Sequence, residues 1–224
     1  MKKKILTAAL AVCMLATLVI GMSLAYFTDT KTAENTFTMG NVKITLDEAK
    51  VTKDETTNTW IAGDERVTAN DYGTIYPGAV LPKDPTVHNT GVNAAYIRAK
   101  VNVSNWMNIV PEAFPNFGAT YPSDGYKAAL ELLVDQLGEG WSVVGVEAGD
   151  VFTVGQFDAK FVLKYDGALA SGANTTPIFG NVKVPPAFDS NHDYLFNKIT
   201  VVAEAIQADG FDTWEAAFAA FDGE

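Results

Sequence analysis

The sequence predicts an all-β protein, an antiparallel β-sandwich with short helical insertions and a short C-terminal helix. Many short segments alternate apolar and polar side chains, as strands with one buried face do. Turn-forming residues separate these segments, and helical periodicity is confined to two short stretches. Hydrophobic residues make up 48% of the 224 residues, so the chain can bury a sizeable core.

The clearest predicted strand is Ala95–Val103. Ile97 and Val101 face one way in it, whereas Arg98 and Lys100 face the other. Similar patterns predict further strands at residues 84–88, 141–146, 151–154, 157–165, 178–184 and 199–206. Many short strands with turn signals between them and little helix are typical of an antiparallel sandwich.

Apolar and polar residues also alternate around Gly40, near the N-terminus. Phe37 and Met39 precede this glycine, and Ile44 and Leu46 follow it. We therefore expect residues 36–46 to form a strand pair or one bulged strand. Residues 47–75 are mostly polar and support at most one irregular hairpin.

The first helical stretch lies in the middle of the chain. In residues 126–137, apolar side chains recur at helical spacing, and Gly138 follows at the position of a C-terminal cap. The preceding residues, 104–125, are rich in aromatic residues and proline, and we interpret them as an irregular loop or insertion.

The second helical stretch lies at the C-terminus. Asp212 and Glu215 are spaced as a capping pair. Trp214, Phe218 and Phe221 then fall on one helical face. We expect this short helix to cover one end of the sandwich; the alternative is a docking surface for another protein.

The first 25 residues have the pattern of an export signal. Three lysines follow the initiator methionine, and an apolar run of 16 residues comes after them. Ser23 and Ala25 are small residues at the −3 and −1 positions of a cleavage site, which predicts a mature chain that begins at Tyr26. Residues 26–224 are then expected to form a single domain.

Two other interpretations of this segment remain open. One is a retained membrane anchor, although the apolar run is shorter than the roughly 20 residues that a spanning helix needs. The other is lipid attachment at Cys13, although cleavage there would cut the apolar run in half. We therefore expect a secreted protein that meets the membrane only through its uncleaved leader.

The charge and cysteine content exclude several classes of function. The formal net charge is −11, and removal of the three leader lysines would make it −14. Such an acidic chain is repelled by nucleic-acid phosphates and by anionic lipids. Cys13 is the only cysteine, so the mature chain would have no disulfide, no thiol nucleophile and no thiolate metal site.

No motif in the sequence points to catalysis. His88 and His192 stand far apart, no helical His pair for zinc is present, and no nucleophile elbow or phosphate-binding loop occurs. Residues 189–193 are rich in oxygen ligands, but a solvated turn explains them better than a calcium loop does. We predict no catalytic residue, no metal ligand and no cofactor.

One run near the predicted cleavage site resembles a known family. Residues 23–31 read SLAYFTDTK, and residues 35–42 read NTFTMGNV. A leader that ends in a small residue, followed by A-x-F-x-D and N-x-F-x-x-G, is similar to the TasA/camelysin family. These are surface and biofilm-matrix proteins of Gram-positive bacteria. Residues 84–91 with 95–98, and 177–182 with 203–207, also fit the family.

The resemblance implies a jelly-roll sandwich and export through a SipW-type signal peptidase. In the TasA branch, subunits form extracellular fibres, because an N-terminal donor strand of one copy completes the sheet of the next. Carried over, the donor strand comprises residues 26–39 and is followed by a glycine. Its marker residues are Tyr26, Phe27, Asp29, Phe37, Met39 and Gly40.

The resemblance also leaves rival functions open. The camelysin branch is described as a cell-surface metallopeptidase, and a surface adhesin that does not polymerise is a third possibility. For the fibre hypothesis, the implied partners are further copies of the chain, the signal peptidase and other matrix proteins.

Overall fold

A computed structural model of the chain describes residues 41–106, 109, 124–153, 156–188 and 198–223. The predicted leader and cleavage site (Ser23, Ala25 and Tyr26) lie outside the described residues. So do the other predicted donor residues, Phe27, Asp29, Phe37, Met39 and Gly40. The fold below is that of the body that begins at Asn41.

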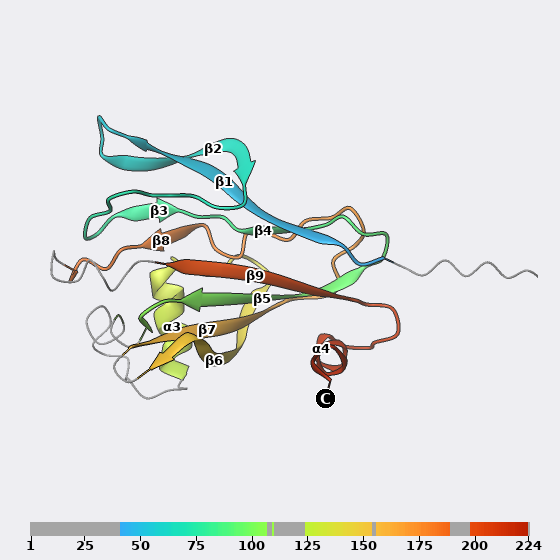
Figure 1. Ribbon diagram of the computed structural model, residues 1–224. Coiled ribbons are helices and arrows are strands. Elements are labelled where there is room, and N and C mark those ends of the chain that lie inside the picture. Colours follow the sequence, from blue (N-terminus) through green and yellow to red (C-terminus); the bar gives the residue numbers. More distant parts are fainter. Residues whose placement is uncertain (1–40, 107–108, 110–123, 154–155, 189–197, 224) are drawn as a thin grey trace, which may run out of the picture. The chain divides into compact units, whose positions relative to one another are not determined.

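The larger of the sheets has four antiparallel strands (Figure 1). In spatial order they are β6 (Trp141–Thr153), β7 (Gln156–Tyr165), β5 (Ala95–Val103) and β9 (Ile199–Gln207). The central strand β5 pairs along its whole length with β9 and along most of it with β7. Strand β9 is therefore an edge strand of this sheet.

The second layer is made from shorter antiparallel pairings. A three-stranded sheet has the order β2 (Thr59–Val67), β1 (Ile44–Asp54) and β4 (Thr86–Asn89). A two-stranded sheet pairs β3 (Val80–Pro82) with β8 (Asn181–Lys183). The prediction of an all-β antiparallel sandwich is confirmed.

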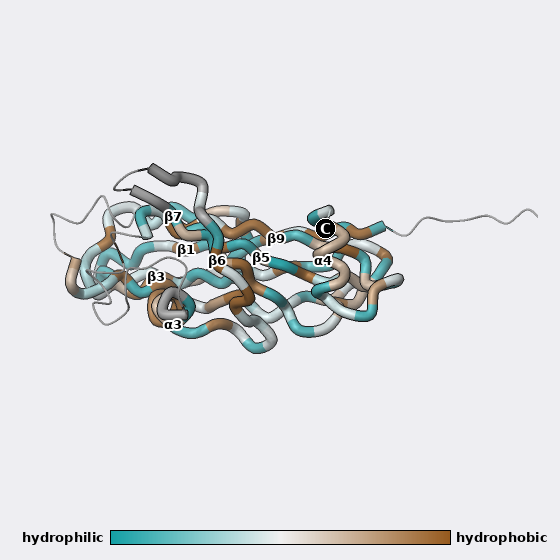
Figure 2. Tube along the Cα trace, turned by 90° about the horizontal axis from the view of Figure 1, so that it is seen from below, coloured by the Kyte–Doolittle hydropathy of each residue, from teal (hydrophilic) through white to brown (hydrophobic). Residues whose placement is uncertain are grey.

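The core lies between these layers and is centred on β5. Ile97, Ala99 and Val101 of this strand are completely buried, and Phe161 of β7 is buried beside them. Apolar and hydrophilic positions alternate along the strands, as the brown and teal segments of Figure 2 show. The core side chains of β5 are the ones that the alternation in the sequence predicts.

Strand β1 is longer than the sequence predicts. It continues to Asp54 and forms with β2 a hairpin interrupted by a bulge, which is the irregular hairpin that residues 47–75 predict. The reason for the difference in length is a register shift between Ala49 and Val51, together with the buried charged residue Glu48 just before it. A bulge and an inward-facing charge both break the alternation that marks a strand.

Two predicted strands merge into one for a similar reason. Residues 141–146 and 151–154 were expected as separate strands, but β6 runs continuously over Trp141–Thr153. Its register with β7 shifts twice, between Val143 and Gly145 and between Ala148 and Phe152.

The first helix, α3 (Asp124–Leu133), ends one turn earlier than predicted. Asp135 and Gln136 adopt positive φ angles of 54° and 78° and turn the chain after it. Gly138 is therefore not the cap. A Cβ at this glycine would lie 1.9 Å from the carbonyl oxygen of Pro177, so close backbone approach is what requires glycine there.

The C-terminal helix, α4 (Trp214–Asp222), is capped by Thr213 and not by Asp212. The Thr213 side chain accepts a hydrogen bond from the backbone N–H of Ala216, as an N-cap residue does. At the other end, Gly223 has a left-handed φ of 83°. The helix therefore begins one residue later than a cap at Asp212 would place it.

Helix α4 is held against the sheet by Arg98 of β5, whose side chain is 6% exposed. Its guanidinium donates two hydrogen bonds to Asp222, at 2.6 and 2.7 Å, and one to Glu204 of β9, at 2.5 Å. The Phe218 ring stacks on it at 4.3 Å. The Trp214 indole N–H also donates to Ile97 O at 2.8 Å, so α4 covers the beginning of β5.

We expect Arg98→Met to lower the free energy of unfolding by about 2 kcal/mol, because it leaves Asp222 and Glu204 without their donor. Urea unfolding followed by tryptophan fluorescence measures the change. The matched control is Lys183→Met, which removes an exposed ion pair with Asp135 and should cost less than about 1 kcal/mol. Equal losses in the two variants would contradict the bracing role of Arg98.

Candidate assembly site

The outer edge of β9 carries unpaired backbone groups. Hydrogen bonds from Ala208 N to Ala94 O and from Ser104 N to Lys198 O show that even-numbered residues of this strand face β5. Because backbone groups alternate in direction along a strand, Val201, Ala203 and Ala205 point their N–H and C=O groups away from the sheet. Within the described part of the chain, no residue pairs with this edge.

The first residues of β1 have a free edge as well. Thr90 and Gly91 donate their N–H groups to Lys43 O, at 2.8 and 2.9 Å, so odd-numbered residues of β1 face β4. The backbone groups of Ile44 and Leu46 therefore point the other way. Strand β2 pairs on that side only from Glu48 onward, so β1 is uncovered before this residue.

Core side chains next to these two edges are only half buried. They lie on β1, on the short segment just before it, and on β9. Strands β1 and β9 contact one another but are not hydrogen-bonded neighbours in a sheet. We call them the open side: Val42, Ile44, Leu46, Ile199, Val201, Ala203 and Ala205. All of them pack on the core, yet none reaches the full burial of the β5 side chains. The sandwich is therefore incompletely closed between β1 and β9.

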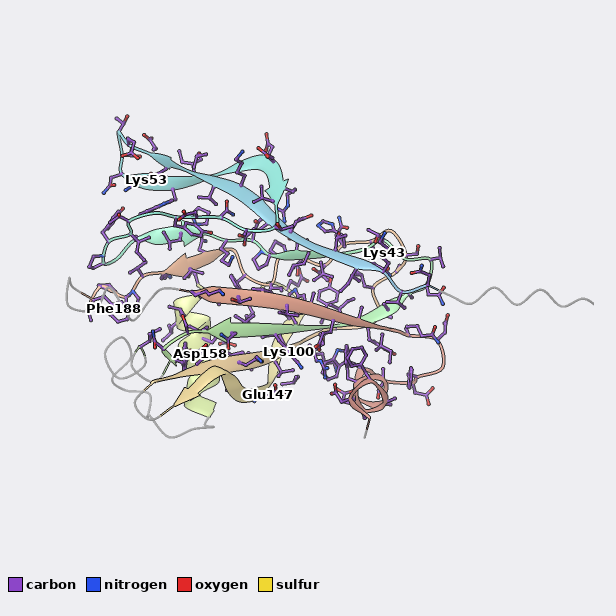
Figure 3. The ribbon with its side chains drawn as sticks, in the orientation of Figure 1. Lys43, Lys53, Lys100, Glu147, Asp158 and Phe188 are labelled. Atoms are coloured by element: carbon purple, nitrogen blue, oxygen red, sulfur yellow. The ribbon has the colours of Figure 1, made fainter. Side chains whose placement is uncertain are left out.

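The chain enters the body beside the open side. Figure 3 labels Lys43 at the beginning of β1. Val92 N donates to Asn41 O at 3.1 Å, which fixes this entry against the turn before β5. A Cβ at Gly91 would lie 2.5 Å from Asn41 O, so the tight entry requires glycine at that position. The described body therefore begins at Asn41, two residues after the last residue of the predicted donor segment, Met39.

A network of charged side chains fixes β1 to its neighbours. Asp47 accepts hydrogen bonds from Arg66 of β2, at 2.7 Å, and from His88 of β4, at 2.9 Å. Arg66 also donates to Asp84 at 2.5 Å. Burial opposes ionisation of Asp47, but the hydrogen bonds from His88 and Arg66 outweigh it and lower the pKa of this carboxyl group.

Sequence reasoning identified these strands but missed the open side. It predicts a strand at residues 199–206, and the side chains of this strand that pack on the core are Ile199, Val201, Ala203 and Ala205. It did not recognise that the strand lies at an edge, because edge position depends on the order of strands in the sheet. The only local signal is that Val202 on the other face is apolar and 49% exposed.

The comparison with known proteins adds the family. Residues 1–104, just under half of the chain, match the family model described as camelysin metallo-endopeptidase. This part of the chain is similar to the TasA/camelysin family. The resemblance that the N-terminal motifs indicate is thereby confirmed. No curated protein and no solved structure matches the chain.

The family's description as a metallo-endopeptidase implies a metal, and the described residues do not fit one. In residues 41–106, 109, 124–153, 156–188 and 198–223, no group of three or more His, Cys, Asp and Glu side chains could hold a metal ion. His88 already has both ring nitrogens in hydrogen bonds, to Asp47 and to Asn174. His192 and the oxygen-rich residues 189–193 lie outside the described residues.

TasA/camelysin-family proteins are cell-surface or secreted proteins. Among the helices of the described residues, none is long and apolar enough to cross a membrane.

We expect the protein to lose stability as the pH falls below about 4. The pKa of Asp47 is lowered by the hydrogen bonds above, and that of Asp222 is lowered by its hydrogen bonds with Arg98. Because these values lie below the unfolded value of about 3.9, the stabilisation is complete above that pH and is lost as the pH falls through the folded values. Melting temperatures between pH 7 and about pH 2.5 test this, and the double variant Asp47→Asn/Asp222→Asn should show a shallower decline than the natural protein.

Proposed function

We propose that this protein is a secreted structural subunit that assembles into extracellular matrix fibres by donor-strand complementation. Residues 26–39 of one copy would occupy the open side of the next copy. The observation that carries the proposal is the combination of the free backbone edge of β9 with half-buried core side chains beside it. An added strand can satisfy both at once.

The composition of the N-terminal segment suits such an occupant. Phe27, Phe37 and Met39 supply apolar side chains for the half-covered core, with polar residues between them. Burying each contributes about 1.5–3 kcal/mol, or roughly 5–9 kcal/mol together. Association costs an estimated 4–15 kcal/mol in lost freedom. Side-chain burial alone is therefore marginal, and hydrogen bonds along β9 must add to it.

The donor segment and the open side are different surfaces of one chain, so each contact leaves a free donor and a free acceptor. Such a head-to-tail contact does not close and propagates into a filament. In this proposal, a SipW-type signal peptidase cleaves between Ala25 and Tyr26 and releases the donor segment, and other matrix proteins are further partners.

A cell-surface metallopeptidase is the second candidate, and the family's description is the observation that favours it. The two functions make opposite forecasts for purified mature protein. A peptidase would degrade a casein substrate and lose this activity with a chelator. A structural subunit would form filaments whether or not the chelator is present. A surface adhesin would stay monomeric and bind a ligand.

We expect deletion of residues 26–35 from the mature protein to abolish filaments and to leave a folded monomer, because the described core is built from side chains of residue 42 and beyond. Negative-stain electron microscopy detects the filaments, and circular dichroism with gel filtration checks the monomer. Mature protein that stays monomeric at high concentration, with residues 26–39 paired inside its own sheet, would contradict the proposal.

We expect Ala203→Lys to block filament growth, because it places an ammonium group on the open side beside the free edge of β9. The matched control is Val202→Lys, one residue away on the exposed opposite face of the same strand. Filament mass after centrifugation should fall at least about tenfold for the first variant, the equivalent of ~1.4 kcal/mol in the contact. Equal yields from the two variants would show that β9 does not receive the strand.

A further inference from the structure

A lysine, an asparagine and a buried glutamate meet beside the bulge of β1. Glu48 is 4% exposed. One of its carboxylate oxygens, Oε2, accepts a hydrogen bond from Lys83 Nζ at 2.5 Å, and the other, Oε1, accepts one from Asn70 Nδ2 at 3.0 Å. The Lys83 amine and the Asn70 carboxamide therefore contact the two oxygens of the same carboxylate group. The three residues come from β1, from the segment after β2 and from the residue after β3.

The backbone of the bulge orients the Asn70 amide. Its Oδ1 accepts a hydrogen bond from Val51 N at 2.7 Å, and its Nδ2 donates a second bond to Ala49 O at 2.8 Å. The Val51 N–H thus polarises the amide carbonyl, whereas Nδ2 faces Glu48. A donor aimed at the carbonyl oxygen also stabilises negative charge that develops there during attack on the carbon.

The surroundings of this cluster hold little water. The Lys83 side chain is 14% exposed, which is low for a lysine. Tyr72 lies next to it in the structure and donates its hydroxyl to Pro82 O at 2.6 Å. Burial, with the nearby charges of Glu48 and Asp84, raises the pKa of Tyr72 well above its usual range. The contact between Lys83 and Glu48 is therefore largely shielded from solvent.

We propose that Lys83 and Asn70 form an intramolecular isopeptide bond and that Glu48 is the acid and base for its formation. The Glu48 carboxylate takes a proton from the Lys83 ammonium group through Oε2. The free amine attacks Asn70 Cγ and forms a C–N bond, and the oxyanion on Oδ1 is stabilised by Val51 N–H. The amine gives up its second proton as the Cγ–Nδ2 bond breaks, and the protons from the amine nitrogen and from Glu48 leave with Nδ2 as an ammonium ion. Glu48 ends as the carboxylate it was at the start, and the ammonium ion carries away the positive charge that Lys83 had.

The bond would serve as a covalent cross-link, as disulfide bonds do in other extracellular proteins. The predicted mature chain has no cysteine, so a covalent cross-link outside the cell must use other side chains. This one would close the stretch from Asn70 to Lys83, which joins the β1–β2 hairpin to β3. Closing a loop of this kind stabilises a fold mainly through the entropy of the unfolded chain. The inference stands whether or not the protein forms fibres.

The test is the intact mass of the purified, folded full-length or mature protein. We expect a mass lower than that of the sequence by one molecule of ammonia. Trypsin should fail to cut after Lys83, because its amine is blocked, and residues 67–98 should appear as one peptide with the same deficit. Asn70→Asp should lose water in place of ammonia, because the same amine then condenses with a carboxyl group.

Three variants identify the reacting groups. Lys83→Arg, Asn70→Ala and Glu48→Gln should each have the full mass of their sequences, with folding checked by circular dichroism. The matched control, Lys50→Arg, changes a lysine that pairs with Glu65 on the exposed hairpin, and it should keep the deficit. A succinimide at Asn70 also loses ammonia, but it would persist in Lys83→Arg. A folded natural protein at full sequence mass, or a deficit that survives Lys83→Arg, overturns the proposal.

Discussion

The free edge of β9 is the constraint on which the rest of the architecture depends. Backbone N–H and C=O groups must find partners, and an edge strand offers a row of them to whatever comes near. Here the edge is long, it is apolar on its inner face, and core side chains beside it are only half covered. Arg98 and α4 hold this strand to β5 from the outer face, so the edge is presented by a rigid sheet. An edge built in this way is suited to receive another strand.

The bulge of β1 is a second organising feature, because it brings polar groups inward. Glu48 occupies a position where the pattern of the strand calls for an apolar side chain, and it is buried all the same. Its charge is matched by Lys83, and the backbone groups that the bulge releases are matched by Asn70 and by Asp84, which accepts from Ala49 N. Buried polar clusters of this kind are stable only when every member has a partner.

Much of the fold could be predicted from sequence, because strong alternation marks strands that have one face in the core. Strand β5 was predicted with its exact bounds, and β7 and β9 within one residue. The bulges of β1 and β6 could not be found, since a register shift moves the apolar positions to the other face. The capping residue of α4 was misplaced by one position, because Asp212 and Thr213 are both good caps and only the helix start decides between them.

The site was less predictable, for a different reason. Motifs near residues 23–42 led to the family, but they lie mostly outside the residues that form the sandwich. The open side and the Glu48 cluster each join parts of the chain that are distant in sequence: β1 with β9 in the first, and Glu48 with Lys83 in the second. Such proximity follows from strand order, which local patterns do not encode. The anchoring of Asn41 against Val92 has a mechanical consequence. A pulling force applied at Asn41 along β1 would load the β1–β4 hydrogen bonds in shear, so they would have to break together and not one after another. The attachment would therefore resist extension at the point where a filament of such subunits would carry the load.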